Sequence, residues 1–345
     1  MIKSDIKSMT IDELKILLTQ MGEKPFRAKQ IFQWLHQKNV NDFDSMTNLS
    51  KELRKKLNEN TKIFNALQVE KKVSEQDETS KYLFALEEDN IIESVLMKYN
   101  YGNTACISTQ VGCRMGCMFC ASTLEGVERN LSAGEMLSQI YEIQKDSESR
   151  ISNVVLMGSG EPLDNYDNVL KFIHLANSPE GLNLGQRHIT LSTCGLIEQM
   201  YRLAEENLQI TLAVSLHAPN DEIRNKIMPV SRKNTMQELL KTCKYYSEHT
   251  KRRITFEYAM IQGVNDTEEC AKQLSGHLHH MLCHVNLIPM NEVKERDYKK
   301  SNTETVERFA KILNERGIET TIRRKLGSDI YAACGQLRRG YLKRE

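Results

Sequence analysis

The chain has 345 residues, of which 40% are hydrophobic and 27% charged, and its formal net charge is +1. This length allows one large domain or two, and the composition is that of a globular protein in water. No apolar run approaches the roughly 18 residues of a membrane-spanning helix, and the N-terminus lacks the apolar stretch of a secretory signal. We therefore expect a cytoplasmic protein without membrane contacts.

The cysteine content favours reduced thiols over structural disulfides. The nine cysteines are an odd number and are scattered through a chain of medium length. Small secreted proteins instead concentrate an even number of cysteines in a short sequence. Metal ligands, catalytic thiols and buried thiols are the functions left to consider.

The first hundred residues are predicted to form helices followed by short strands. Residues 10–60 have helical apolar spacing, and Thr10 with Glu13 three positions later is typical of a capping box. KYLFALEED and IIESVLMKY indicate antiparallel strands joined by a turn near Glu88 to Asn90. We predict a small α+β accessory domain over residues 1–98.

From residue 103 onward, short apolar strands alternate with amphipathic helices. The predicted strands are TACISTQ, NVVLMGS, HITLSTC, QITLAVSL, RITFEYAMI, CHVNLIP and ETTIRR. The predicted helices lie near residues 132–146, 165–177, 197–207, 235–249, 266–281 and 303–316. This alternation indicates an α/β fold with a parallel sheet, and six or so repeats predict a partial (β/α)6 barrel over residues 99–345. Ligands of such folds bind at the C-terminal ends of the strands.

Three cysteines follow the first strand of the predicted barrel in the sequence CRMGCMFC. Cys113, Cys117 and Cys120 have the spacing CxxxCxxC, and Gly112 and Gly116 allow the loop to curl around a compact centre. Thiolates suit zinc or an iron–sulfur cluster, and three of them leave one iron of a four-iron cluster open to another ligand. A zinc site completed by a distant cysteine and simple core thiols are the alternatives.

The cysteine spacing at the end of a first barrel strand resembles the radical S-adenosylmethionine superfamily. The resemblance implies a 4Fe-4S cluster held by the three cysteines, whose open iron chelates S-adenosylmethionine and cleaves it to a 5′-deoxyadenosyl radical. Later strand ends supply glycines and polar groups for this ligand, although a glycine-rich turn after a strand is often only a turn. The predicted cofactor contacts are Gly160, Glu161, Ser192, Ser215, Leu216, His217 and Asn291.

Two further cysteines and several motifs resemble one family closely, the RlmN-type RNA adenine C2 methyltransferases. Cys106 lies seven residues before Cys113, and Cys334 lies between small residues near the C-terminus. Taken singly, each would be a buried structural thiol. The motifs that carry the resemblance are GEKPFRAKQIFQWLH, CISTQVGC, FCASTLEGVERNL, MGSGEPLDN, LSTCG, SLHAPN and RKLGSDIYAACGQL. They extend from about residue 10 to about residue 340.

The resemblance implies a mechanism in which two cysteines have different roles. C2 of adenine is electrophilic and cannot displace a methyl group from a sulfonium. Cys334 instead takes the methyl group of one S-adenosylmethionine, and a radical made from a second one activates that methyl for addition to C2. Cys106 then attacks the Cys334 sulfur, which forms a disulfide and frees the methylated base.

A glutamate thirteen residues before the resolving cysteine is the family's proton acceptor, and this position is Glu93. From the sequence alone, Glu93 would be an ordinary exposed strand carboxylate. With the resemblance it becomes the candidate base that removes the C2 proton. The remaining cysteines are interpreted as structural thiols, with Cys194 nearest to a predicted strand end: Cys194, Cys243, Cys270 and Cys283.

The resemblance also names partners: 23S ribosomal RNA, adenine 37 of tRNA, and an electron donor such as flavodoxin or ferredoxin. Basic residues at 51–56 and from Arg323 onward could meet RNA phosphates. Without the resemblance, a solvated face would be the favoured explanation for them. We expect a monomer. The alternatives are a Cfr-like enzyme acting at C8, which Pro162 and the RKLGSD segment disfavour, and a non-enzymatic zinc-binding RNA chaperone.

Overall fold

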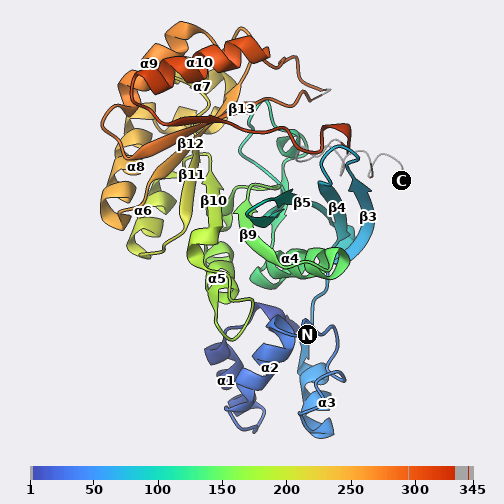
Figure 1. Ribbon diagram of the computed structural model, residues 1–345. Helices are drawn as coiled ribbons and strands as arrows, with labels where there is room; N and C mark the ends of the chain where they lie inside the picture. The colour runs from blue at the N-terminus through green and yellow to red at the C-terminus, as the bar shows by residue number, and fades with distance from the viewer. Residues whose placement is uncertain (1–2, 294, 331–340, 342–345) are drawn as a thin grey trace.

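The structure, a computed structural model, describes residues 3–293, 295–330 and 341, and it begins with a helical lobe (Figure 1). The lobe contains three helices, which are α1 (Ile11–Gln20), α2 (Arg27–His36) and α3 (Lys51–Asn60). A short parallel pair, β1 (Ser4–Asp5) and β2 (Thr61–Lys62), closes its two ends. The Thr10 hydroxyl accepts from the Glu13 N–H, and the Glu13 carboxylate accepts from the Thr10 N–H. The predicted helices and capping box are therefore confirmed.

One ten-stranded sheet forms the centre of the rest of the chain. Its order is β14-β13-β12-β11-β10-β9-β6-β5-β4-β3, and the seven strands from β6 to β14 run parallel. The parallel strands are β6 (Gly102–Cys106), β9 (Ile151–Leu156), β10 (Ile189–Thr193), β11 (Thr211–Ser215), β12 (Ile254–Met260), β13 (Cys283–Pro289) and β14 (Thr320–Ile322). All seven predicted core strands are present, although the first ends at Cys106 instead of reaching Gln110.

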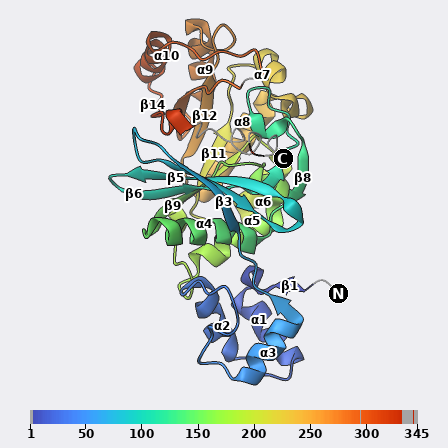
Figure 2. The same ribbon diagram turned by 90° about the vertical axis from the view of Figure 1, so that its right-hand side faces the viewer.

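Three antiparallel strands extend this sheet beyond β6. They are β3 (Leu67–Val73), β4 (Ser80–Ala85) and β5 (Ile91–Tyr99). The β4–β5 turn lies where it was predicted. Glu88 and Asp89 reverse the chain there with the left-handed φ values of 60° and 58°. The predicted boundary between residues 98 and 99 falls inside β5. Strands β3–β5 of the predicted accessory domain therefore belong to the same sheet as the predicted core. The three helices and the short pair β1–β2 form the separate lobe in Figure 2.

Helices cover the outer face of the curved parallel sheet (Figure 1). They are α4 (Ala133–Ser147), α5 (Tyr166–Asn177), α6 (Ile197–Glu205), α7 (Asp221–Ile227), α8 (Met236–Thr250), α9 (Glu268–Leu278) and α10 (Thr303–Glu315). Six of these match predicted segments, whereas α7 is too short to have a clear apolar period. The fold is thus a mixed α/β fold of the predicted barrel type. Within the described residues, no helix has both the length and the apolar character that crossing a bilayer requires.

Buried polar contacts hold the helical lobe against α4. His36 at the end of α2 is buried, and its Nδ1 lies 2.9 Å from the hydroxyl of Tyr141 on α4. The Gly134 N–H donates to the Ser8 hydroxyl at 2.8 Å. A Cβ on Gly134 would lie 2.2 Å from an oxygen of Asp5, so only glycine allows this close approach. The lobe therefore packs against α4 between Gly134 and Tyr141.

Burial of His36 predicts a specific pH dependence of stability. Desolvation, with a smaller contribution from the Lys7 charge, lowers the pKa of His36 to about 3. The unfolded chain binds a proton near about pH 6.5 that the folded chain does not, so stability falls by about 1.4 kcal/mol per pH unit as the pH drops below that value. In His36→Gln, urea unfolding between about pH 6 and pH 4 should show a dependence shallower by about that amount. Parallel curves for the two proteins would contradict this assignment.

Candidate active site

A two-stranded hairpin carries the CxxxCxxC loop. β7 (Gln110–Gly112) and β8 (Val127–Asn130) pair antiparallel, and the loop between them contains the three cysteines. Gly112 has φ +77°, and a Cβ there would lie 2.0 Å from the carbonyl oxygen of Gly126. The Cys113 N–H donates to that same carbonyl at 2.7 Å. The loop is therefore closed at its base, and Gly112 is the residue that permits closure.

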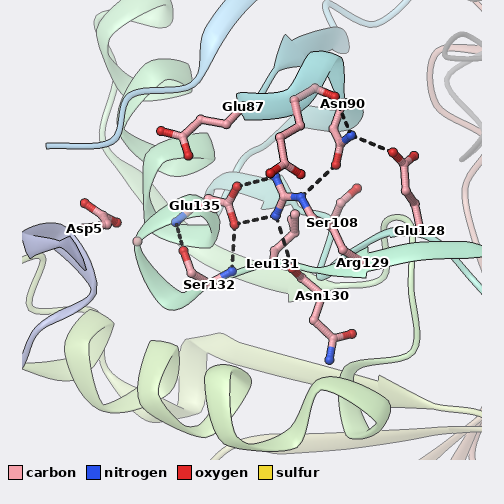
Figure 3. A network of polar contacts seen from close by, with 12 residues as sticks. Asp5, Glu87, Asn90, Ser108, Glu128, Arg129, Asn130, Leu131, Ser132 and Glu135 are labelled. Carbon is pink, nitrogen blue, oxygen red and sulfur yellow. Dashed lines mark hydrogen bonds and ion pairs between the residues drawn. The ribbon is translucent and has the colours of Figure 1, made fainter. Parts of the chain in front are cut away.

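A polar network fixes this hairpin to α4 and to the β4–β5 turn (Figure 3). Arg129 on β8 donates to both carboxylate oxygens of Glu135, at 3.0 and 2.7 Å. Its Nε donates to the side-chain oxygen of Asn90 at 2.7 Å, and the Asn90 amide donates to Glu128 at the same distance. Glu135 also completes a capping box with Ser132 at the start of α4. A bidentate arginine–carboxylate pair gives this anchor a defined orientation.

The three thiols meet in one cavity of about 260 Å³ at the C-terminal ends of the parallel strands. Within the loop, the Thr123 hydroxyl donates to the carbonyls of Cys117 and Cys120 at 3.0 Å each. The Met118 N–H donates to the carbonyl of Ile227 at the end of α7. The loop is thus held both internally and from the neighbouring helix.

The donor set fits an iron–sulfur cluster. Burial raises the pKa of Cys113 to about 12, and burial together with the charges of Cys120 and Cys113 raises the pKa of Cys117. Iron cations would reverse this effect because they stabilise thiolates directly. No three potential ligands among the described residues come together as a site for one ion. A four-iron cluster does not require that, since each cysteine binds a different iron.

Glycines and a buried carboxylate line the cavity after β9. A Cβ on Gly158 would lie 2.6 Å from the Ile107 carbonyl oxygen, and Gly160 has φ +108° and lies against Gln110. Glu161 is buried, and its two oxygens accept from the N–H groups of Cys194 and Leu163 at 2.8 and 3.1 Å. Desolvation raises the pKa of Glu161, and these hydrogen bonds oppose that shift.

Most of the other predicted cofactor contacts also line this cavity. Ser192, Ser215, His217 and Asn291 are lining residues. His217 has φ 56°, and its Nδ1 accepts from the Ala259 N–H at 2.9 Å. Desolvation, followed by the Arg224 charge, lowers the pKa of His217 to about 3, so its ring is neutral at physiological pH. Leu216 is fully buried and does not line the cavity.

Arg224 on α7 supports the strand ends below the cavity. Its side chain is 2% exposed and donates to three backbone carbonyls, those of Cys194, Ser215 and Leu216, at 2.8, 3.2 and 3.2 Å. These carbonyls lie where β10 and β11 end, and a buried carbonyl without a donor is costly. Arg224 therefore fixes the backbone that presents Ser215 and His217. Sequence reasoning did not identify it.

A second cavity of about 360 Å³ adjoins the first and contains Cys106. The two cavities share lining residues, which are Met157, Ile288, Met290, Asn291 and Arg323. Cys106 ends β6 and is buried beside Val95 and Met97 of β5. The eight cysteines among the described residues form no disulfide with one another. The structure thus brings Cys106 to the same strand-end region as the three loop cysteines.

Glu93 lies on the face of β5 that carries Val95, but it is not exposed. Val95 and Cys106 are cross-strand partners, and Glu93 precedes Val95 by two residues, so all three project from one face of the sheet. The expectation of an exposed carboxylate is wrong, because Glu93 is 4% exposed. Its oxygen lies 3.1 Å from Nζ of Lys81. Glu93 itself is not among the lining residues of the second cavity.

The segment after β14 crosses the second cavity toward the β3–β4 turn (Figure 1). The Gly327 N–H donates to Asp77 at 2.8 Å. Asp329 accepts from the Ser74 hydroxyl and from the Glu75 N–H at 2.7 and 3.0 Å. Residues 323–330 therefore lead directly to the segment that carries Cys334, which lies outside the described residues.

Two charged residues that line the first cavity, Glu257 and Arg323, were missed as site residues by the sequence analysis. Glu257 on β12 is 5% exposed, lines the first cavity and accepts from the Asn286 amide at 2.9 Å. Desolvation raises the pKa of Glu257, whereas the Arg323 charge lowers it. An acidic residue within the apolar strand RITFEYAMI was the signal that could have identified it. Arg323 lines both cavities and had been interpreted only as part of a basic tail.

Comparison with known proteins places the chain in one family. Residues 4–63 match the family described as ribosomal RNA large subunit methyltransferase N-terminal domain, and residues 107–274 match the radical SAM superfamily. The chain is 58% identical over 342 residues, 99% of each chain, to a probable dual-specificity RNA methyltransferase RlmN from Alkaliphilus oremlandii. Identity to a protein of that name from Clostridium novyi is 56% over 98% of this chain and 99% of the relative.

A solved structure shows the same fold. The crystal structure of a radical SAM methyltransferase from Sphaerobacter thermophilus superposes with a TM-score of 0.91 at 40% identity, covering 96% of this chain and 98% of that one. The matches over residues 4–63 and 107–274 and the full-length relatives agree with the cavity that holds the CxxxCxxC cysteines. The chain belongs to the RlmN family of radical S-adenosylmethionine methyltransferases.

Proposed function

We propose that this enzyme methylates C2 of adenine in 23S ribosomal RNA and also adenine 37 of tRNA. The observation that carries the proposal is the position of Cys106, whose cavity shares a wall with the cavity of Cys113, Cys117 and Cys120. A methyl transfer that needs a resolving thiol requires such proximity. The relatives named dual-specificity RNA methyltransferases support two kinds of RNA substrate.

The loop cysteines would hold one 4Fe-4S cluster, and the first cavity would hold S-adenosylmethionine. When bound, this pair supplies a radical that can remove hydrogen from a methyl group. Gly158 and Gly160 allow the backbone to approach the ligand closely. Glu161, Ser192, Ser215 and Asn291 offer polar groups to it, and neutral His217 adds no charge to the cavity. We place Leu216 in support of its neighbours, because its side chain is buried.

The protein's own residues carry the methyl group to the base. The Cys334 sulfur takes the methyl from one S-adenosylmethionine, and a second one is consumed when that methyl is activated and bonded to C2. Glu93 accepts the proton that C2 loses. The Cys106 thiolate then attacks the Cys334 sulfur. A sulfur–sulfur bond forms, the carbon–sulfur bond breaks, and its electron pair stays on the carbon, which takes up a proton and becomes the methyl group.

Basic residues around the second cavity support an RNA substrate. Lys300, Arg323, Arg324 and Lys325 line it beside Cys106. An adenine that reaches this region must leave its stack, and phosphates on either side of it would meet these cations. On α3 the basic residues are partly engaged, because Lys56 pairs with Glu23 at 2.6 Å. The cavity rim is therefore the better-supported RNA contact. The electron donor, the monomeric state and the cytoplasmic location stay predictions.

Mass spectrometry of digested RNA tests the proposal. Anaerobic enzyme with S-adenosylmethionine and a reductant should convert adenosine in a 23S fragment, and in a tRNA with adenine 37, to 2-methyladenosine. Cys334→Ala is the matched control and should give none. Production of 8-methyladenosine would favour the Cfr-like alternative, and a zinc-bound protein without iron would reject a radical enzyme altogether.

A further inference from the structure

The candidate base is paired with a lysine in the interior of the fold. Nζ of Lys81 on β4 lies 3.1 Å from an oxygen of Glu93 on β5, and the two side chains are 0% and 5% exposed. By contrast, the neighbouring pair of Lys71 and Asp146 is 30% and 24% exposed. An ionised group is rarely buried to this degree unless its partner and its position serve a purpose.

The pair lies close to the resolving cysteine. Lys81 is the cross-strand partner of Val95, and Val95 is in turn the partner of Cys106. Lys81, Val95 and Cys106 therefore form a row across three adjacent strands, and Glu93 is the diagonal neighbour in that row. Apolar residues Leu83 and Ile91 pack on the same face. A purely structural need at this place could be met by two apolar side chains.

We propose that Lys81 is a positioning residue that holds Glu93 ready to accept the C2 proton. The inference rests on the proposed function and deepens it. In the step concerned, the proton of the C2–H bond moves to a Glu93 oxygen and the bonding electron pair restores the aromatic ring. The one unpaired electron that the methylene radical brought would pass to a one-electron acceptor, a role that an oxidised iron–sulfur cluster held by the three loop cysteines could fill. The Lys81 ammonium directs one carboxylate oxygen toward itself and thereby orients the other.

The test is single-turnover reaction of Lys81→Met with RNA that carries the target adenine. Radical formation, read as 5′-deoxyadenosine, should stay within about twofold of the unmodified enzyme. Release of 2-methyladenosine should fall about 100-fold, the loss expected when a reacting group is misplaced by about 1 Å. The covalent RNA–protein adduct should accumulate although Cys106 is intact. Lys98→Met is the matched control, because Lys98 on β5 pairs with Glu78 at the surface and should leave all three readouts unchanged.

A structural role would have a different signature. If Lys81→Met lowered iron content and 5′-deoxyadenosine together with the product, without adduct, the inference would be overturned. The double variant Lys81→Met/Glu93→Gln removes both charges of this pair together, so neither is left opposite a neutral partner. It should also stall as the adduct, and normal product release by it would overturn the inference. If the unmodified enzyme made no 2-methyladenosine, both the proposed function and this inference would be overturned. If the unmodified enzyme were active and Lys81→Met turned over normally, only the inference would be overturned.

Discussion

Cys106→Ala should bind RNA covalently and fail to release it. The methylene bridge between Cys334 and C2 is broken only when a second thiolate attacks the Cys334 sulfur, and alanine has no sulfur for this step. About one RNA per chain should remain attached after a single turnover, and free methylated RNA should fall below detection. A denaturing gel with labelled RNA measures the attached fraction, and mass spectrometry of the released fraction measures the product.

The structure sets the control for this experiment. Cys106 is buried beside Val95 and Met97, so removal of its sulfur leaves a small gap in this cluster. Cys283→Ala removes a partly buried thiol at the N-terminal end of β13, far along the strand from the cavities. It should release product normally. Normal release by Cys106→Ala would instead remove Cys106 from the mechanism.

The parallel part of the fold was predictable because its signal is local. A strand buried on both faces is a short apolar run, and the helix that follows has its own period. Each core strand was found in this way, from NVVLMGS to ETTIRR. The joining of β3–β5 to this sheet was not predictable, because the pairing of β5 with β6 is set by tertiary contacts. We predicted a domain boundary at residues 98 and 99, where the strand pattern changes from antiparallel to parallel. The structure instead continues one sheet across this position, through β5, β6 and β9.

The site was predictable where sequence spacing carries the chemistry. CxxxCxxC and the glycines after β9 are read directly from the chain, and the cavity holds both. By contrast, no spacing pattern in the sequence shows that a charged strand residue is buried. Lys81 in SKYLFA and Glu93 in IIESVLM are single charges in largely apolar strands, and the sequence alone does not show that they pair across the two strands. Arg224 escaped notice for the same reason, because its partners are backbone carbonyls of distant strands.

Cys117→Ala should abolish both cluster binding and radical formation. With one of three ligands lost, the cluster cannot keep three irons bound to protein, so iron should fall from about four per chain to well below one. The loss follows from the position of Cys117 between Cys113 and Cys120 in a loop that is closed by the Gly126 carbonyl. Iron and sulfide analysis after anaerobic reconstitution measures the first effect, and 5′-deoxyadenosine formation measures the second.

Cys194→Ala distinguishes a cluster ligand from a thiol that merely borders the cavity. Cys194 lines the same cavity as Cys117, and burial raises its pKa, followed by the charges of Glu161 and Cys117. The Cys194 backbone N–H donates to the Glu161 carboxylate, and alanine retains this contact although it loses the hydrogen bond of the thiol to Glu161. Cys194→Ala should therefore keep its iron. Loss of iron from this variant, with iron retained by Cys117→Ala, would show that the cluster is held by a different set of cysteines than the CxxxCxxC loop supplies.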